Sequence, residues 1–180
     1  NGLAVAINPD NGREWYVAVF QKNRGRLLRT DDGGKTFQEV YFTPLERFGV
    51  FDVAYDRSRG TVMIATGQGD LLETANQGRT WRRVRLFADG LIRLLASPVN
   101  PAVRFVVSPK GSIFRTQDNG ASWSDITPAL NAFSGARNSQ RWAVDQNGTL
   151  YLGSERGLLS SRDNGATFTA DMSVTVVTLS

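Results

Sequence analysis

Cysteine and histidine are both absent from the 180 residues. Without cysteine the chain forms no disulfide framework and no Cys-His dyad, and without histidine it forms no Ser-His-Asp triad. The usual zinc sites are excluded as well, because their ligands come mainly from these two residue types. We therefore expect neither a metal site nor a cofactor in this chain.

Long apolar runs are also missing. No stretch approaches the ~18 consecutive apolar residues of a membrane span, so we expect none. The chain begins with Asn1, and no basic segment followed by an apolar one precedes the first strand-like run, which we interpret as a processed or excerpted sequence. Its length and its hydrophobic content of 41% predict one domain with a substantial core.

Lysine is scarce, since only three of the 21 basic residues are lysine and arginine supplies the rest of a formal net charge of +4. The planar guanidinium group suits carboxylate and phosphate partners. The densest group comprises Arg79, Arg82, Arg83 and Arg85, which we interpret as a charged edge strand that discourages aggregation between sheets. No aromatic stacking series or nucleic-acid motif accompanies it, so we expect no specific nucleic-acid binding.

One short pattern occurs four times. The copies are TDDGGKTF (30–37), TANQGRTW (74–81), TQDNGASW (116–123) and SRDNGATF (161–168), with starts 44, 42 and 45 residues apart. Each copy follows two or three short runs of β-forming residues, and no segment has helical periodicity. A period in the low forties with about four short strands is typical of propeller blades.

We therefore predict an all-β fold, a β-propeller of four-stranded antiparallel blades at about 1–43, 44–88, 89–135 and 136–172. Residues 173–180 read as the inner strand of a further blade, because a lone inner strand would leave an unpaired edge. The simplest interpretation is one partial propeller domain of a six- to eight-bladed ring. A closed four-bladed ring with 173–180 as an appendage, or two copies assembled into a larger ring, are the alternatives.

The repeated pattern, Ser/Thr-x-Asp-x-Gly-x-Thr-Trp/Phe, resembles the Asp-box or BNR repeat of sialidases, xyloglucan-cleaving propellers, sortilin-type receptors and photosystem II assembly-factor propellers. Two positions depart from it, Asn76 in place of the acid and Ser122 in place of threonine. The resemblance implies propeller blades, but it covers several functions. We also expect an extracytoplasmic protein, whether secreted, periplasmic or on the cell surface.

The box residues are predicted to be structural. The glycines supply positive φ, the Asp or Asn side chains accept backbone N–H groups across the turn, and the aromatic residues fold back into the apolar layer and fix the hairpin to its blade. Asn76 supports this interpretation, because an amide accepts hydrogen bonds but cannot act as a general acid or base. The structural set is Asp32, Gly34, Phe37, Asn76, Gly78, Trp81, Asp118, Gly120, Trp123, Asp163, Gly165 and Phe168.

The predicted ligand face lies at the opposite end of the blades. In propellers resembling this one, ligands meet the face around the central channel that the boxes point away from. Aligning the innermost strands puts Ala4, Asp52, Arg93 and Arg141 in one column. Two interpretations stay open, because buried charges are costly unless paired. Either Asp52 pairs with an arginine or the charges lie in channel water, or Arg93 and Arg141 form an anion-accepting patch.

Further candidates lie on the same rim. Turns between the second and third strands and the strand beside Arg141 add ligand-binding candidates Lys22, Arg24, Lys110, Arg156 and Trp142. The long connection 125–139 carries Phe133 and Arg137 and is either a recognition loop or an ordinary surface connection.

Three functions are compatible with these features. The main hypothesis is a non-catalytic propeller scaffold that recognises a protein or an anionic glycan or carboxylate-bearing ligand, with self-association if the ring is partial. The alternative is a fragment of a glycoside hydrolase of the sialidase or xyloglucanase type. Its candidate catalytic carboxylate is Asp52, the only acid of the inner column, and Asp89 and Glu46 are possible partners on loops. Sialidase-like chemistry would need an arginine triad and an Arg-Ile-Pro segment that is absent. The third hypothesis is a purely structural domain of a larger surface protein.

Overall fold

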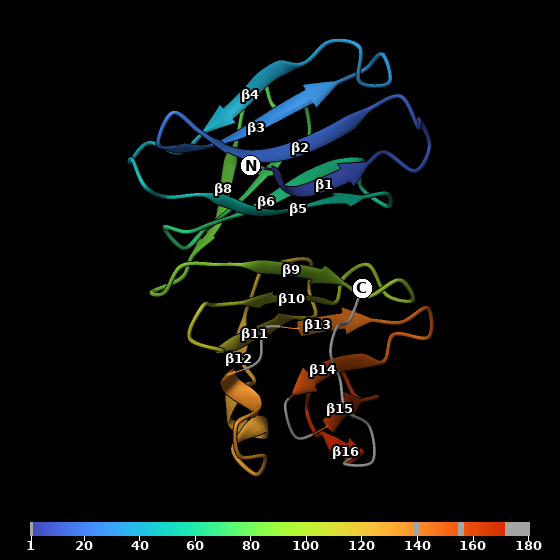
Figure 1. Cartoon of the computed structure of the whole chain (residues 1–180). Helices are drawn as coiled ribbons and strands as arrows, with labels where there is room; N and C mark the ends of the chain where they lie inside the picture. Colours follow the sequence, from blue (N-terminus) through green and yellow to red (C-terminus); the bar gives the residue numbers. More distant parts are fainter. Residues whose placement is uncertain (1, 139–140, 155–156, 172–180) are drawn as a thin grey trace. The chain divides into compact units, whose positions relative to one another are not determined.

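The structure is a computed structural model that describes residues 2–138, 141–154 and 157–171. It contains four antiparallel sheets of four strands each, and in every sheet the strands lie side by side in sequence order. This is the meander that the repeat predicts, and we number the sheets blades 1 to 4 along the chain (Figure 1). The all-β propeller-blade prediction is confirmed.

The strands of the first two blades are short and rich in β-branched and aromatic residues, which favour pleated, half-buried strands. Blade 1 comprises β1 (Gly2–Ile7), β2 (Trp15–Gln21), β3 (Arg24–Thr30) and β4 (Gln38–Phe42). Blade 2 comprises β5 (Val50–Asp56), β6 (Thr61–Thr66), β7 (Asp70–Thr74) and β8 (Arg82–Leu86).

The other two blades follow the same plan with shorter outer strands. Blade 3 comprises β9 (Arg93–Ala96), β10 (Arg104–Val107), β11 (Ile113–Thr116) and β12 (Ser124–Asp125). Blade 4 comprises β13 (Arg141–Val144), β14 (Leu150–Ser154), β15 (Gly157–Ser161) and β16 (Thr169–Asp171). Between them lie two short 3₁₀ turns, η1 (Thr127–Leu130) and η2 (Ala136–Asn138). All strands fall inside the predicted blade ranges, whereas the strand predicted at 173–180 lies outside the described residues.

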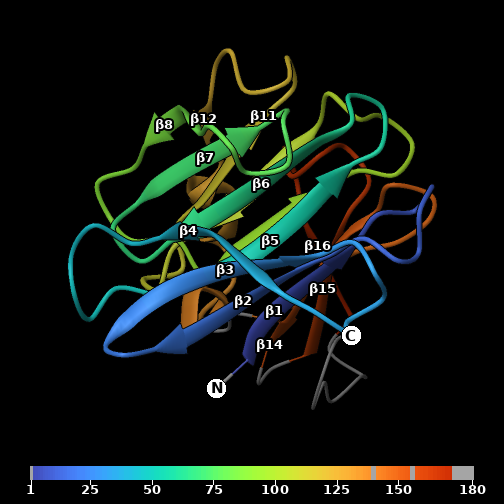
Figure 2. The same cartoon turned by 90° about the horizontal axis from the view of Figure 1, so that it is seen from above.

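The chain divides into two compact units, residues 1–94 and 95–180, with the boundary inside β9. Unit 1 holds blades 1 and 2, whose inner strands β1 and β5 pack together. Figure 2 shows the strands of these two blades from above. Each unit has its own core of side chains contributed by two successive blades.

The unit 1 core shows how one blade packs on the next. A row across blade 1, from Ala4 through Ala18 and Leu27 to Tyr41, runs through consecutive paired positions of its four strands. This row meets a row across blade 2, made of Val53, Ile64 and Leu72. We call the first kind of surface the back face of a blade and the second kind its front face. Two small alanines on the back face leave room for the larger residues of the next front face, which is how close-packed interiors avoid voids.

Candidate functional site

The four repeated turns join the third and fourth strands of each blade, and all four are built alike. In the turn of blade 3 the Thr116 hydroxyl donates to Asp118 Oδ1 at 2.7 Å and accepts from the Gly120 N–H at 2.9 Å. The Ser122 N–H donates to the same Oδ1 at 2.9 Å, and the Ser122 hydroxyl donates to Oδ2. Asn119 and Gly120 have φ of 59° and 92°, in the left-handed region that glycine and asparagine tolerate best.

These hydrogen bonds hold the turn acids in the ionised form. Donation by the Ser122 hydroxyl and N–H lowers the pKa of Asp118 to about 2. The same arrangement around Thr167 lowers the pKa of Asp163 to about 2, and donation by Thr36 lowers the pKa of Asp32. A carboxylate committed to three donors in this way is a poor general acid or base near neutral pH.

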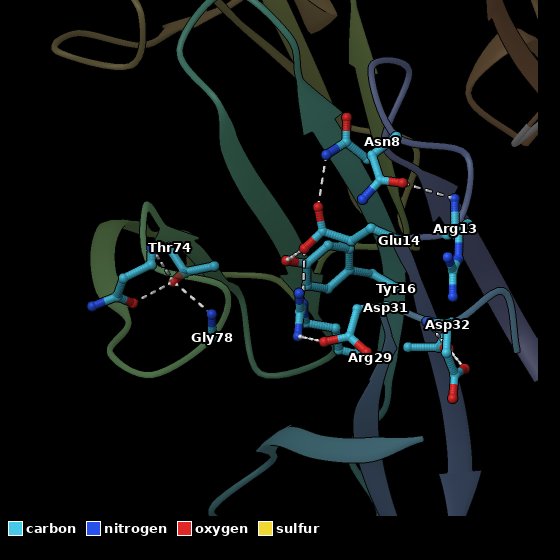
Figure 3. Close-up of polar contacts among 12 residues, drawn as sticks. Asn8, Arg13, Glu14, Tyr16, Arg29, Asp31, Asp32, Thr74 and Gly78 are labelled. Carbon is cyan, nitrogen blue, oxygen red and sulfur yellow. Dashed lines mark hydrogen bonds and ion pairs between the residues drawn. The ribbon is translucent and has the colours of Figure 1, made fainter. Parts of the chain in front are cut away.

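Asn76 performs the same task without a charge. Its Oδ1 accepts from the Thr74 hydroxyl at 3.0 Å and from the Thr80 N–H at 2.9 Å. The Thr74 hydroxyl in turn accepts the Gly78 N–H at 3.0 Å (Figure 3). The Asn76 Nδ2 donates to the Thr80 hydroxyl at 2.8 Å, so this one hydrogen bond runs in the opposite direction from its counterparts in the acidic turns. The geometry therefore supports the structural role expected for this position.

The aromatic residues of the turns differ from the prediction. Trp81 packs in the unit 1 core, but its partner is the preceding blade. Its ring lies edge-on to Tyr41 with centroids 5.6 Å apart, and its Nε1 donates to the Val40 carbonyl. Phe168 is buried, whereas Phe37 is 44% exposed and does not fold into the apolar layer. The expectation that each aromatic side chain fixes the hairpin to its own blade is therefore wrong for Trp81 and Phe37.

The strand register aligns the inner-strand column as predicted for three of its members. Ala4 faces Ala18, Asp52 faces Ala65 and Arg141 faces Gly153, and these partners are equivalent positions of the second strands. The side chains of Ala4 and Asp52 belong to unit 1 and that of Arg141 to unit 2.

Asp52 is a candidate ligand-binding residue whose pKa is shifted by its surroundings. Its Oδ2 accepts the Leu94 N–H at 2.8 Å and its Oδ1 accepts the Val53 N–H at 3.0 Å. Burial raises the pKa of this carboxyl, an effect that the Leu94 N–H, the charge of Arg93 and the Val53 N–H only partly offset. The pKa of Asp52 is therefore above its ordinary value. No other carboxyl group of the described residues is among the causes of this shift. The charge of Arg93 therefore acts on the Asp52 carboxyl group, and the two interpretations of the inner-strand charges both stay predictions.

Trp142 lies in the core and not on a ligand face. It is 1% exposed, and its ring lies 6.3 Å from that of Phe168 at an interplanar angle of 72°. Its paired position, Leu152, is fully buried as well. Trp142 is equivalent to Val53 of blade 2 and belongs to the front face of blade 4. The placement of Trp142 among the ligand-binding candidates was wrong, because neighbouring residues of a strand point to opposite faces and Arg141 takes the other face.

The rim candidates are mostly at the surface. Lys22 is exposed in a tight turn with φ of 51°, and Lys110 is exposed as well. Arg24 instead donates to the Thr43 carbonyl at 2.9 Å and lies 3.8 Å from Glu46, so it braces the connection to the next blade. Arg156 lies outside the described residues.

The long connection is partly a structural element. Leu130 and Ala136 are buried in the unit 2 core, and Phe133 packs against it. Arg137 is exposed. The aromatic residue proposed for recognition therefore stabilises the loop, which leaves Arg137 as its accessible candidate.

A buried polar cluster in blade 1 was not anticipated from the sequence. Glu14 is 6% exposed and accepts three hydrogen bonds, from Asn8 Nδ2 at 2.6 Å, Arg29 Nε at 2.8 Å and the Tyr16 hydroxyl at 3.1 Å (Figure 3). Arg29 also donates to Asp31. Burial alone would raise the pKa of Glu14, but the three donors and the Arg29 charge hold it below its ordinary value. Burial and the Glu14 carboxylate raise the pKa of Tyr16.

Blade 2 holds a second buried carboxylate. Glu73 is 6% exposed and binds Arg59 at 2.5 Å and Arg82 at 2.6 Å. Arg82, Arg83 and Arg85 lie along β8, the outermost strand of the blade, with exposed side chains, as expected for a charged edge. The cross-strand register accounts for the pair of Glu73 and Arg82, because it places the two residues directly opposite each other.

A groove of about 330 Å³ lies between β4 and the turn of blade 2. Its lining includes Tyr41, Phe42, Arg79 and Trp81. Among the described residues, no group of three or more acidic side chains gathers where it could hold a metal ion. The described helices are two single turns, and none is long and apolar enough to cross a membrane.

The fold assigns this chain to a structural class, the β-propellers. Four antiparallel four-stranded sheets in sequence order are blades of a β-propeller, and the solved structures that resemble this chain are propeller proteins. No protein-family model matches the sequence.

The similar proteins fall into two groups, the xyloglucanases and YCF48. A xyloglucanase of Hypocrea jecorina (strain QM6a) is 26% identical over 186 residues, which cover 92% of this chain and 22% of that protein. The GH74 xyloglucanase from Xanthomonas campestris superposes with a TM-score of 0.71 at 16% identity, over 93% of this chain and 30% of that one. YCF48 from Cyanidioschyzon merolae superposes with a TM-score of 0.67 at 17% identity, over 97% and 56% of the two chains. The chain thus spans about a fifth of the curated relative that it matches.

Proposed function

We propose that this chain is part of a xyloglucanase-like propeller enzyme, a glycoside hydrolase acting on a β-glucan. The observation that carries the proposal is the 26% identity to a xyloglucanase along 92% of the chain. The likeness to GH74 structures supports the fold alone, at 16% identity for the Xanthomonas campestris enzyme. The proposal favours the glycoside hydrolase alternative over a non-catalytic scaffold.

Asp52 is the carboxyl group that we propose for the chemistry. Glycosidases use two carboxyl groups, and the general acid needs a raised pKa so that it is protonated before it donates. Burial raises the pKa of Asp52, which fits the acid better than the nucleophile or base. No carboxyl group of the described residues is among the causes that shift the pKa of Asp52, and we propose that the second carboxyl group comes from elsewhere in the enzyme.

The test uses the longest polypeptide that contains these residues, assayed for release of reducing ends from xyloglucan. We expect Asp52→Asn to lower kcat by about 10²- to 10⁴-fold, the usual contribution of a general acid, with binding of xyloglucan retained. Asp10→Asn is the matched control, because Asp10 is an exposed carboxylate whose partner is Arg57. Full activity of Asp52→Asn would remove Asp52 from the mechanism, and the absence of both turnover and binding of xyloglucan would overturn the proposal.

A second candidate function is protein recognition without catalysis. Both carboxylate oxygens of Asp52 already accept backbone N–H groups, which is what a purely structural aspartate would do. Arg93, Arg141, Lys22 and Lys110 would then bind a carboxylate-rich partner, and binding would weaken with added salt. Arg141→Glu is the informative variant, because Arg141 is exposed. Unchanged affinity of this variant for an acidic protein partner would contradict the arginine patch.

Two further assignments accompany the proposal. The shared hydrogen-bonding of the four turns supports membership of the Asp-box repeat family. An enzyme that cleaves a polysaccharide must meet it outside the cytoplasm, because such a polymer does not cross a membrane unaided. Fractionation of cells that express the full-length protein tests this location.

A further inference from the structure

Phe51 is an extra residue in β5, the inner strand of blade 2. Val50 pairs with Thr66 of β6. The next pair along the two strands joins Asp52 to Ala65, so β5 takes two steps where β6 takes one. The extra residue of such a β-bulge has its side chain turned out of the ordinary alternation, and bulges are frequent next to functional sites. Phe51 is accordingly 38% exposed, whereas Val50 is fully buried.

The Phe51 ring lies against glycine backbone on one side. A Cβ added at Gly49 would lie 3.1–3.3 Å from the ring atoms Cζ, Cε2 and Cε1. Because these three distances are nearly equal, the Gly49 position lies over one face of the ring and not beyond its edge. A Cβ added at Gly67 would lie 2.8 Å from Cε2. A side chain at either position would press on the ring, so the two glycines let it lie flat on the backbone.

The backbone under the ring is held by hydrogen bonds from two blades. The Gly67 N–H donates to the Gly49 carbonyl at 2.9 Å. The Phe48 carbonyl accepts the Gly25 N–H at 2.8 Å and the Thr43 hydroxyl at 3.0 Å. All of these residues belong to unit 1. The ring is therefore placed before any ligand arrives, which lowers the entropic cost of binding.

The position of Phe51 connects it to the proposed chemistry. Phe51 lies at the start of β5, which is the end of blade 2 opposite its repeated turn, 74–81. Asp52 is the next residue of the same strand, so the two Cα atoms are about 3.8 Å apart. A ligand that covers the Phe51 ring therefore lies beside the carboxyl group that we propose as the general acid.

An aromatic ring with one free face suits a sugar ring. The hydroxyl groups of β-linked glucose are equatorial, so each face of the pyranose ring presents C–H groups. These groups carry partial positive charge, and the face of an aromatic ring carries partial negative charge. Phenylalanine has no polar group, so such a contact selects a neutral ring and does not depend on a charge.

We infer that Phe51 is a platform on which one glucose residue of a β-glucan stacks beside Asp52. The inference rests on the proposed glycoside hydrolase function and adds a substrate-binding residue to it. A platform of this kind contacts the sugar equally in the ground state and in the transition state. Its loss should therefore raise KM and leave kcat nearly unchanged.

The test uses the longest polypeptide that contains these residues, with xyloglucan as the probe. Phe51→Ala should raise KM about tenfold at nearly constant kcat, as expected for the loss of one aromatic stacking contact. Phe51→Leu keeps apolar bulk over the glycines but lacks a π face, so it should raise KM as well, whereas Phe51→Tyr should behave like the wild type. Phe37→Ala is the matched control, because Phe37 is 44% exposed in a repeated turn at the other end of the blades.

Affinity electrophoresis in gels with and without xyloglucan measures binding whether or not the polymer is cleaved. Retardation of the wild type and Phe51→Tyr that is lost in both Phe51→Ala and Phe51→Leu, at unchanged melting temperature of Phe51→Leu, is the expected result. Equal retardation of all variants, or full retardation of Phe51→Leu, would overturn the platform and leave the enzymatic proposal standing. A wild type that binds xyloglucan through Phe51 without cleaving it would overturn the enzymatic proposal alone, and one that neither binds nor cleaves it would overturn both.

Discussion

Truncation of Trp142 separates a core residue from a ligand residue. The side chain is 1% exposed and contacts Phe168 edge-on. Removing a fully buried tryptophan side chain costs about 3–5 kcal/mol, of which the aromatic pair supplies roughly 0.5–1.5 kcal/mol. Domains are stable by only about 5–15 kcal/mol, so Trp142→Ala should remove a large share of the total. At roughly 4–8 °C per kcal/mol for a unit of this size, the melting temperature should fall by at least about 12 °C.

Urea unfolding followed by circular dichroism measures this effect, with Trp142→Phe as the control. Phenylalanine keeps an aromatic ring against Phe168, so its midpoint should lie between those of the wild type and Trp142→Ala. An unchanged midpoint for Trp142→Ala would refute the placement of Trp142 in the core. Loss of ligand binding at unchanged stability would restore it to the ligand face.

Three further predictions concern the turns and the buried polar cluster. Asp118→Asn should keep the melting temperature close to that of the wild type, because Asn76 makes the equivalent turn hydrogen bonds. Asp118→Ala should lower the melting temperature measured by calorimetry. Equal melting temperatures of the two variants would contradict the hydrogen-bonding role of Asp118. Gly78→Ala should destabilise by more than about 1 kcal/mol in chemical unfolding, because φ is +87° and a Cβ would lie 2.5 Å from the Val40 Cβ, and a stabilised variant would refute this. The pKa of Glu14 is lower in the folded state, so its contribution to stability is complete above its ordinary value of 4.5 and is lost as pH falls through the folded pKa. Glu14→Gln should therefore flatten the decline of the melting temperature below pH 4.5, and an unchanged acid profile would exclude this carboxylate as its cause.

The blades and their turns could be predicted because the signals are local and repeated. Turn chemistry is set within eight residues, and four copies spaced 44, 42 and 45 residues apart indicate where the strands lie. The column of Ala4, Asp52 and Arg141 was also accessible, because a strand register follows from aligned apolar pairs.

The side chains that depend on neighbouring strands were harder to place. Glu14 and Arg29 are 15 residues apart and meet only because Tyr16 pairs with Arg29 across β2 and β3. Periodicity did contain a usable signal for Trp142, since a residue next to Arg141 in a strand points to the other face. Arg156 lies outside the described residues and stays a prediction.

The repeated turn also has a role that its local sequence does not reveal. The glycine of the second turn, Gly78, lies against Val40 of the preceding blade, and Gly165 lies against Ile126 in the same relation. Because these positions have no room for a Cβ, glycine there serves the packing between blades as well as the positive φ of the turn. Phe37 lies in the turn of blade 1 and is 44% exposed. The turns therefore stabilise contacts between successive blades, and this explains why the same residues recur where the inner strands differ.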